Sequence, residues 1–145
     1  VMETKNANGG AGFTEYNDGT IQFETTQWSQ GYYDNGKIWQ TFTLPEGKYE
    51  MRIEVKNAAN IGSGSTNIHF AVAQGESLPD NEELEKSDII LSYLKFESEH
   101  TNKTSALPIF ELTEEKTITV GWVVSFSDIC RNIEFKSVRL WSVAE

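Results

Sequence analysis

The residues best suited to contact a ligand gather in one segment, WSQGYYDNG, at positions 28–36. Trp28, Tyr32 and Tyr33 carry flat rings that are apolar in the body and polar at one edge. Asp34 and Asn35 follow directly and carry short hydrogen-bonding groups. An aromatic ring can stack on the C–H face of a sugar, while acid and amide groups read its hydroxyls. The segment is therefore predicted to be a sugar-binding loop.

A second loop, just before the last expected strand, holds Arg131. Its guanidinium could clamp a carboxylate or stack on a sugar, or it could pair with Asp128. The first segment has a structural alternative too: Trp28 could cap the core, the tyrosines could lock the loop, and positions 34–36 could form a plain turn. The predicted ligand contacts are Trp28, Tyr32, Tyr33, Asp34, Asn35 and Arg131.

Enzyme motifs are missing from the sequence, which contains no G-x-S-x-G, H-E-x-x-H or C-x-x-C pattern. A pair of carboxylates could still hydrolyse a glycosidic bond, and the 22 acidic residues leave that alternative open. A small β domain without a deep cleft is a poor host for such a pair, so binding without catalysis is the favoured interpretation.

Calcium is the cofactor that the sequence suggests, as a structural ion. Oxygen donors lie near the expected strand ends, although their spacing matches no EF-hand and defines no site. These donors are Asp18, Glu24, Asp34 and Asp128.

The chain is acidic, with 12 Lys and Arg against 22 Asp and Glu and a net charge of −10. This balance argues against nucleic acid and anionic membranes as partners, because both reward basic patches. The alternative is that the charges only solvate the outer sheet faces. Cys130 is the single cysteine, so no intramolecular disulfide can form. No apolar run approaches the roughly 18 residues of a membrane-spanning helix.

The strongest structural signal lies between positions 38 and 55. Apolar residues at positions 49, 51, 53 and 55 alternate with charged ones, which is the period of a strand with one buried face. A second alternating run ends at Leu44, and the residues between include Pro45 and Gly47, which favour a tight type I turn. The stretch is predicted to be a β-hairpin.

Eight strands are expected along the chain, with a single helical turn after Pro79 in the acidic segment LPDNEELEKS. A change of parity in the last strand predicts a β-bulge near Lys136 and Ser137. Trp39, Trp122 and Trp141 lie in strands, where their expected role is to fill or edge the core. The expected strands are 20–28, 37–44, 48–57, 67–74, 89–95, 107–112, 116–126 and 132–142.

Eight short strands with frequent turns predict an antiparallel β-sandwich, with a jelly-roll arrangement. The chain is predicted to consist of a flexible leader, 1–19, and one domain, 20–145. It is also predicted to be a fragment of a longer protein. If successive strands alternate in direction, the connections 29–36, 58–66, 96–106 and 127–131 share one end of the domain. Loops gathered on a rigid scaffold are a common place for binding.

Two runs resemble the galactose-binding-like, discoidin-type β-sandwich domains: WQTFTLPEGKY (39–49) and the ending IEFKSVRLW (133–141). The chain is also similar to uncharacterised domains of secreted or lipid-anchored proteins of Bacteroidetes, in the pieces VA (72–73), LPD (78–80) and GW (121–122). The resemblance implies a carbohydrate-binding or adhesive accessory module, often attached to glycan-processing machinery. It also implies binding at the loops of one end and, often, a structural calcium.

The expected function is weak glycan binding by a non-catalytic, extracytoplasmic module on the cell surface, outside the cell or in the periplasm. The alternative is a structural or protein-interaction domain of a larger surface protein, with no small ligand. Expected partners are a glycan and other domains of the parent protein, and no nucleic acid.

Overall fold

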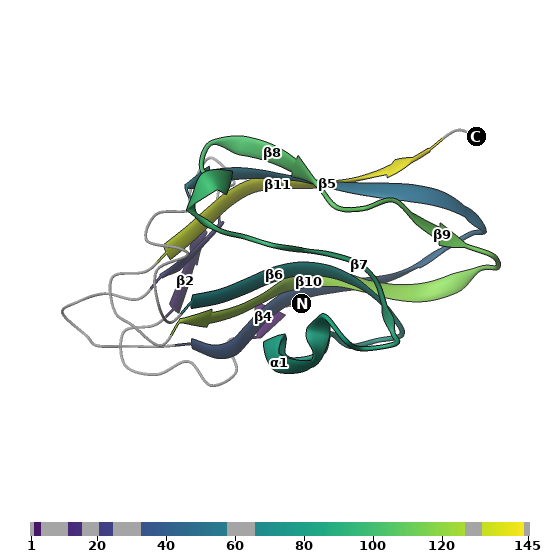
Figure 1. The fold of residues 1–145 in the computed structure, drawn as a ribbon, viewed down its shortest axis with the longest axis horizontal. Coiled ribbons are helices and arrows are strands. Elements are labelled where there is room, and N and C mark those ends of the chain that lie inside the picture. Colours follow the sequence, from purple (N-terminus) through teal and green to yellow (C-terminus); the bar gives the residue numbers. More distant parts are fainter. Residues whose placement is uncertain are drawn as a thin grey trace.

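The computed structural model describes residues 2–3, 12–15, 21–24, 33–57, 66–126 and 132–143. Their strands form two antiparallel sheets that face each other across a core (Figure 1). The first sheet has the order β1 (Met2–Glu3), β4 (Tyr33–Leu44), β10 (Lys116–Phe126), β6 (Thr66–Gln74) and β7 (Ile90–Lys95). The second has the order β2 (Gly12–Glu15), β3 (Ile21–Glu24), β11 (Asn132–Ser142), β5 (Gly47–Asn57) and β8 (Lys103–Ala106), and β9 (Phe110–Leu112) also pairs with β5. This architecture confirms the predicted antiparallel β-sandwich.

Each expected strand has a counterpart, and three short strands add to them. β1 and β2 lie in the segment predicted to be a leader, where β1 pairs with β4 and β2 pairs with β3. β8 lies in the predicted connection 96–106 and pairs with β5. A strand of two to four residues is too short to show an alternating pattern, so only its hydrogen-bonded neighbour reveals it.

The predicted β-hairpin at 38–55 is wrong, because its two strands belong to different sheets. β4 pairs with β10 and β1, whereas β5 pairs with β11, β8 and β9. The chain crosses from one sheet to the other at Pro45 and Glu46, and the Tyr49 hydroxyl donates a hydrogen bond of 2.8 Å to the Pro45 carbonyl. Strands facing across a core and strands paired within one sheet show the same alternation, so the pattern cannot separate the two arrangements.

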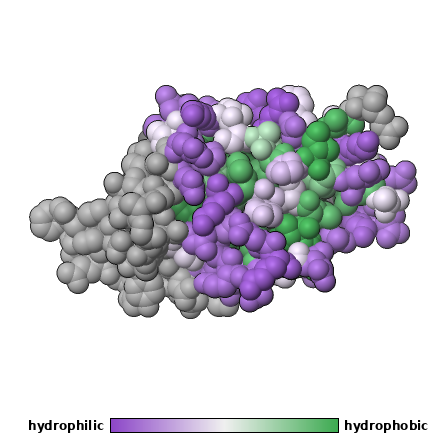
Figure 2. Space-filling model, in the orientation of Figure 1, coloured by the Kyte–Doolittle hydropathy of each residue, from purple (hydrophilic) through white to green (hydrophobic). Residues whose placement is uncertain are grey.

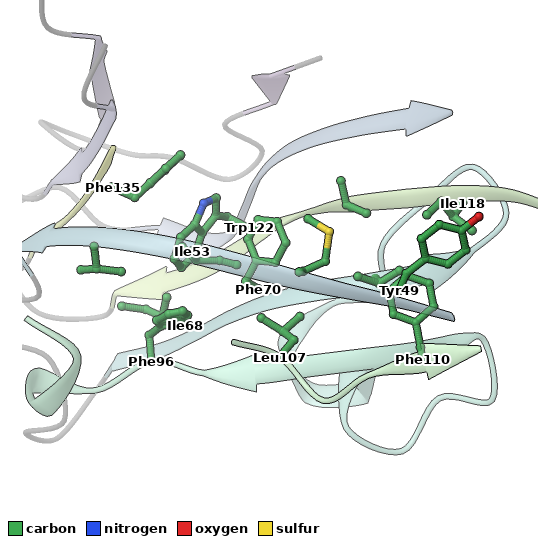
Figure 3. Packing of buried hydrophobic residues seen from close by; sticks show 14 of the residues in the cluster. Tyr49, Ile53, Ile68, Phe70, Phe96, Leu107, Phe110, Ile118, Trp122 and Phe135 are labelled. Carbon is green, nitrogen blue, oxygen red and sulfur yellow. The ribbon is translucent and has the colours of Figure 1, made fainter. Parts of the chain in front are cut away.

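The core between the sheets is centred on Trp122 of β10, which is 1% exposed (Figure 3). Its ring centroid lies 4.8 Å from those of Phe96 and Phe135 and 5.2 Å from that of Phe70. These contacts join the first sheet to β11 of the second sheet. The predicted core role of Trp122 is therefore confirmed.

A β-bulge interrupts β11 where the parity of the sequence changes. The register between β11 and β5 shifts between Phe135 and Ser137, as predicted. Phe135 lies in the core before the bulge, and Val138 and Leu140 pack against the core after it. The bulge therefore keeps apolar residues on the inner face and sends the alternate residues outward.

The outer face of the first sheet is covered by the segment that contains α1 (Asn81–Leu84). Leu78 and Leu84 pack against Ala71, Ala73 and Val123 of the sheet. In Figure 1, α1 lies beneath β4, β10 and β6, which confirms the predicted helical turn after Pro79. No helix in the described part of the chain, α1 and η1 (Ser98–His100) included, is long and apolar enough to cross a membrane.

Strand ends meet at one end of the sandwich, on the left in Figure 1. In the first sheet, the last residue of β10, Phe126, pairs with both Tyr33 and Thr66. In the second sheet, Glu134, near the start of β11, pairs with the last residue of β5, Asn57. The strands that border the predicted connections 29–36, 58–66 and 127–131 thus end together, as the alternation of strand directions predicts.

Candidate functional site

The six predicted ligand contacts fall partly outside the described residues. Trp28, Tyr32 and Arg131 lie outside them. Tyr33, Asp34 and Asn35 are the first three residues of β4, so the predicted loop 29–36 gives way to strand at Tyr33. The strand begins earlier than the sequence suggests because the far end of β10 pairs with it.

Asn35 is 5% exposed and binds neighbouring parts of the chain. Its Nδ2 donates to Glu82 Oε2 at 3.1 Å, and its Oδ1 accepts from the backbone N–H of Asn81 at 2.7 Å. Its own backbone N–H donates to Ser125 Oγ at 3.0 Å. Its φ of 58° is a left-handed conformation that asparagine tolerates better than most residues. Asn35 therefore has a structural role, which ties β4 to α1.

Asn81, the first residue of α1, is the centre of the same polar network and is 4% exposed. Its Oδ1 accepts a hydrogen bond of 2.8 Å from Nδ1 of the buried His69. Its Nδ2 donates to Ser125 Oγ at 2.7 Å and to the Asn67 carbonyl at 3.0 Å. One amide thus holds α1 against β6 and β10.

Replacing Asn81 by alanine is expected to lower the free energy of unfolding by about 1–3 kcal/mol, because buried partners lose their hydrogen bonds. Chemical denaturation measures the effect. Glu83→Ala, at an exposed position of the same helix, is the control and should change stability by less than about 0.5 kcal/mol. Equal effects of the two substitutions would contradict the anchoring role of Asn81.

The outer face of the second sheet carries an open hollow of about 160 Å³. It forms where β5, β8 and β11 lie side by side, since the residues that alternate with the core residues point away from the core. Figure 2 shows hydrophilic side chains over the outer layers of the sandwich, with hydrophobic surface gathered between the sheets. The hollow is lined by Arg52, Glu54, Thr104, Ser137, Arg139 and Trp141.

Among the side chains of this face that the structure describes, Trp141 is the exposed aromatic residue, with 47% of its surface accessible. The expectation that Trp141 fills or edges the core is therefore wrong. The Arg52 guanidinium lies 5.6 Å from the centre of the Trp141 ring, within the range of a cation–π contact. This contact restrains the indole while leaving much of its surface free.

Polar groups line up beside Trp141 along the two central strands. Arg52 Nε donates to Glu50 Oε1 at 2.6 Å, and Ser137 Oγ donates to Glu54 Oε2 at 3.3 Å. The register places Arg139 directly opposite Arg52. The hollow thus combines an aromatic surface with cationic, anionic and hydroxyl groups, which is the chemistry that binds a polyhydroxylated ligand.

A second, smaller hollow of about 90 Å³ lies on the opposite side of the molecule, beside α1. Its lining includes Lys37 and Trp39, together with Leu78. The Lys37 ammonium is bound to Asp80 Oδ1 at 2.8 Å and to the Leu78 carbonyl at 2.9 Å. Because its cation is engaged and its face is covered, this hollow offers a ligand less than the one beside Trp141.

A search of the curated proteins found no match. The model of the DUF5013 family, described as a domain of unknown function, matches residues 1–121. The chain belongs to this family. The match ends before β11, so three residues that line the larger hollow lie beyond it.

Solved structures show the same fold as this DUF5013 domain. A xylan-binding module, CBM15, is 13% identical with a TM-score of 0.53, and the match covers 96% of the chain and 90% of the module. Xylanase 10C from Cellvibrio japonicus, solved in complex with xylopentaose, is 16% identical with a TM-score of 0.54, and the match covers 99% of the chain and 29% of the xylanase. At these identities the likeness establishes the fold alone, a β-sandwich like those of carbohydrate-binding modules.

Within the described residues of the DUF5013 domain, no group of three or more His, Cys, Asp or Glu side chains could hold a metal ion. Of the predicted calcium donors, Asp18 and Asp128 lie outside the described part, and the structure places only the backbone of Glu24 and Asp34. A structural calcium bound by these donors therefore stays a prediction.

The site that sequence reasoning missed had a signal in β11. Val138 and Leu140 share one parity and face inward, so Arg139 and Trp141, on the other parity, must face outward. Tryptophan's strong tendency toward burial outweighed that pattern in the sequence interpretation.

Proposed function

We propose that this DUF5013 domain is a non-catalytic glycan-binding module of an extracellular or cell-surface protein. We place the main binding surface on the outer face around Trp141. The observation that carries the proposal is the exposure of Trp141: the residue is 47% exposed and lines a hollow together with polar side chains. An exposed tryptophan on a sheet face contributes little to folding, whereas it offers a flat apolar surface to a ligand.

A sugar ring stacked on Trp141 would have hydrogen-bonding groups next to it along the strands, toward Ser137. Glu54 accepts hydrogen bonds, Arg139 donates them, and the Thr104 hydroxyl can do either. The fold shared with a xylan-binding module supports the same class of ligand. We expect weak affinity, with a Kd of roughly 10 µM to 1 mM, because the hollow is shallow and open to water.

The charges in the hollow support binding without hydrolysis. Glycoside hydrolysis needs two carboxyl groups that flank the scissile bond. Glu54 is the one carboxylate among the residues that line the described hollow. The nearby Glu50 is bound to Arg52 and is only 18% exposed.

We also propose a second contact surface, here called the loop end, made of Trp28, Tyr32, Tyr33, Asp34, Asn35 and Arg131, together with a structural calcium. The amide of Asn35 is engaged with α1, so the aromatic residues and Arg131 carry this proposal. Its described members, Tyr33, Asp34 and Asn35, begin β4 at one end of the sandwich, whereas Trp141 lies on a sheet face.

A glycan array probed with the wild type, with and without calcium, tests the function, and Trp141→Ala tests the site. We expect Trp141→Ala to weaken binding at least tenfold, which corresponds to about 1.4 kcal/mol. Tyr33→Ala is the comparison variant, with folding of each variant checked by circular dichroism. If Tyr33→Ala abolishes binding while Trp141→Ala leaves it unchanged, the loop end is the site. A blank array with folded protein would favour the structural or protein-interaction role.

A further inference from the structure

We infer that the glycan bound by this face carries carboxylate groups and that Arg139 binds them. This inference rests on the proposed function, since it names the ligand class of the same site. Arg139 of β11 and Arg52 of β5 lie directly opposite each other in the antiparallel ladder. Like charges in that position destabilise a sheet unless they are compensated.

Among the described residues, a carboxylate compensates the charge of Arg52 but not that of Arg139. Arg52 is bound to Glu50 at 2.6 Å and lies over the Trp141 ring. Arg139 is exposed, and the described residues give it no hydrogen bond or ion pair. The chain has ten more acidic than basic residues, so many of its own carboxylates could have served as a partner for Arg139. An arginine left open beside an exposed indole therefore points to a ligand.

Two acids lie across the ladder from Arg139, and each accepts a hydrogen bond from a residue other than Arg139. Glu50 and Glu54 occupy the diagonal positions across the ladder, one step to either side of Arg52. Glu50 accepts from Arg52, and Glu54 accepts from Ser137 Oγ at 3.3 Å. Each also lies opposite a neutral residue of β11, Trp141 and Ser137 respectively. The β11 side of the hollow thus offers Arg139 as its charged group, with no acid of its own.

The spacing fits a sugar acid. Trp141 and Arg139 are two residues apart on the same face of a strand, which places their Cα atoms roughly 7 Å apart. A pyranose ring stacked on the indole would direct a carboxylate at its edge toward the guanidinium. Arginine binds a planar carboxylate with two parallel hydrogen bonds, an arrangement that a neutral hydroxymethyl group cannot reproduce.

Two matched pairs of polysaccharides test the inference: glucuronoxylan and polygalacturonate, each compared with its carboxyl-reduced form. Affinity electrophoresis and calorimetry with the whole chain measure binding. The acidic form of at least one pair should bind about tenfold more tightly than its reduced form, and the difference should shrink as salt rises. Arg139→Gln should remove that preference while retaining binding to the reduced form. Arg139→Lys should keep part of it.

Lys136→Gln is the matched control, because it removes one exposed positive charge from the same strand. It should leave the preference intact, and an equal loss in this variant would show that net charge alone is responsible. Wild-type protein that binds acidic and reduced forms equally would overturn the inference and leave the proposed function standing. No binding to any polysaccharide of either pair or to the glycan array would overturn both.

Discussion

Replacing Trp122 by alanine is expected to lower the free energy of unfolding by about 3–5 kcal/mol, the range measured for large buried aromatic residues. Trp122 is 1% exposed, and its ring contacts those of Phe70, Phe96 and Phe135. The substitution would open a cavity at the point where the two sheets meet. Because the surrounding aromatic rings come from both sheets, they cannot all move inward to fill it.

Urea denaturation followed by circular dichroism measures this loss, and Trp141→Ala provides the matched control. Both variants remove an indole from a strand, but Trp141 is 47% exposed and lies on the outer face. We expect Trp141→Ala to cost less than about 1 kcal/mol, in keeping with surface substitutions. Similar losses in the two variants would mean that Trp141 serves the fold, and the proposed binding surface would lose its main support.

Replacing Gly121 by alanine is expected to cost at least about 3 kcal/mol, at the upper end of overpacking effects. A Cβ at this position would collide with the Ile38 carbonyl and would lie 2.7 Å from the Cα of Trp39. Both atoms belong to the backbone of β4, which pairs with β10 at this point. The strands would have to separate, so the collision cannot be relieved by turning a side chain.

Gly75→Ala separates this clash from the general cost of replacing a glycine. Gly75 has a φ of +98°, and a Cβ there would meet nothing within 4 Å. We expect a loss of about 1 kcal/mol from the strained backbone alone. Denaturation of both variants gives the comparison. If Gly121→Ala were as mild as Gly75→Ala, the close approach of β4 and β10 would not be present in solution.

The two outer faces of the sandwich differ in how they are covered, and this difference supports the proposed binding surface around Trp141. The first sheet is covered by α1 and its flanking residues, with Leu84 fully buried. The described part of the second sheet presents a polar outer face on which Trp141 is the large exposed aromatic residue. The covering segment is itself anchored by Asn81, so it acts as part of the fold.

Much of the fold could be predicted from sequence because it depends on local alternation. The apolar residues of β5 are buried at every second position, from Tyr49 to Val55. The shift of parity in β11 marked the bulge between Phe135 and Ser137. Alternation reports which side of a strand is buried, and hydrophobic burial enforces it residue by residue.

Only the tertiary structure decided which strands pair and which polar residues are left open. Alternation permitted a hairpin between β4 and β5, but the chain crosses the core between them. Asn35 suits a binding loop by type, yet α1 packs against β4 and engages its amide. The position of Arg139 opposite Arg52 depends on the pairing of β11 with β5. A side chain's neighbours across a sheet come from distant parts of the chain, so pairing and packing energies, which local patterns do not encode, select them.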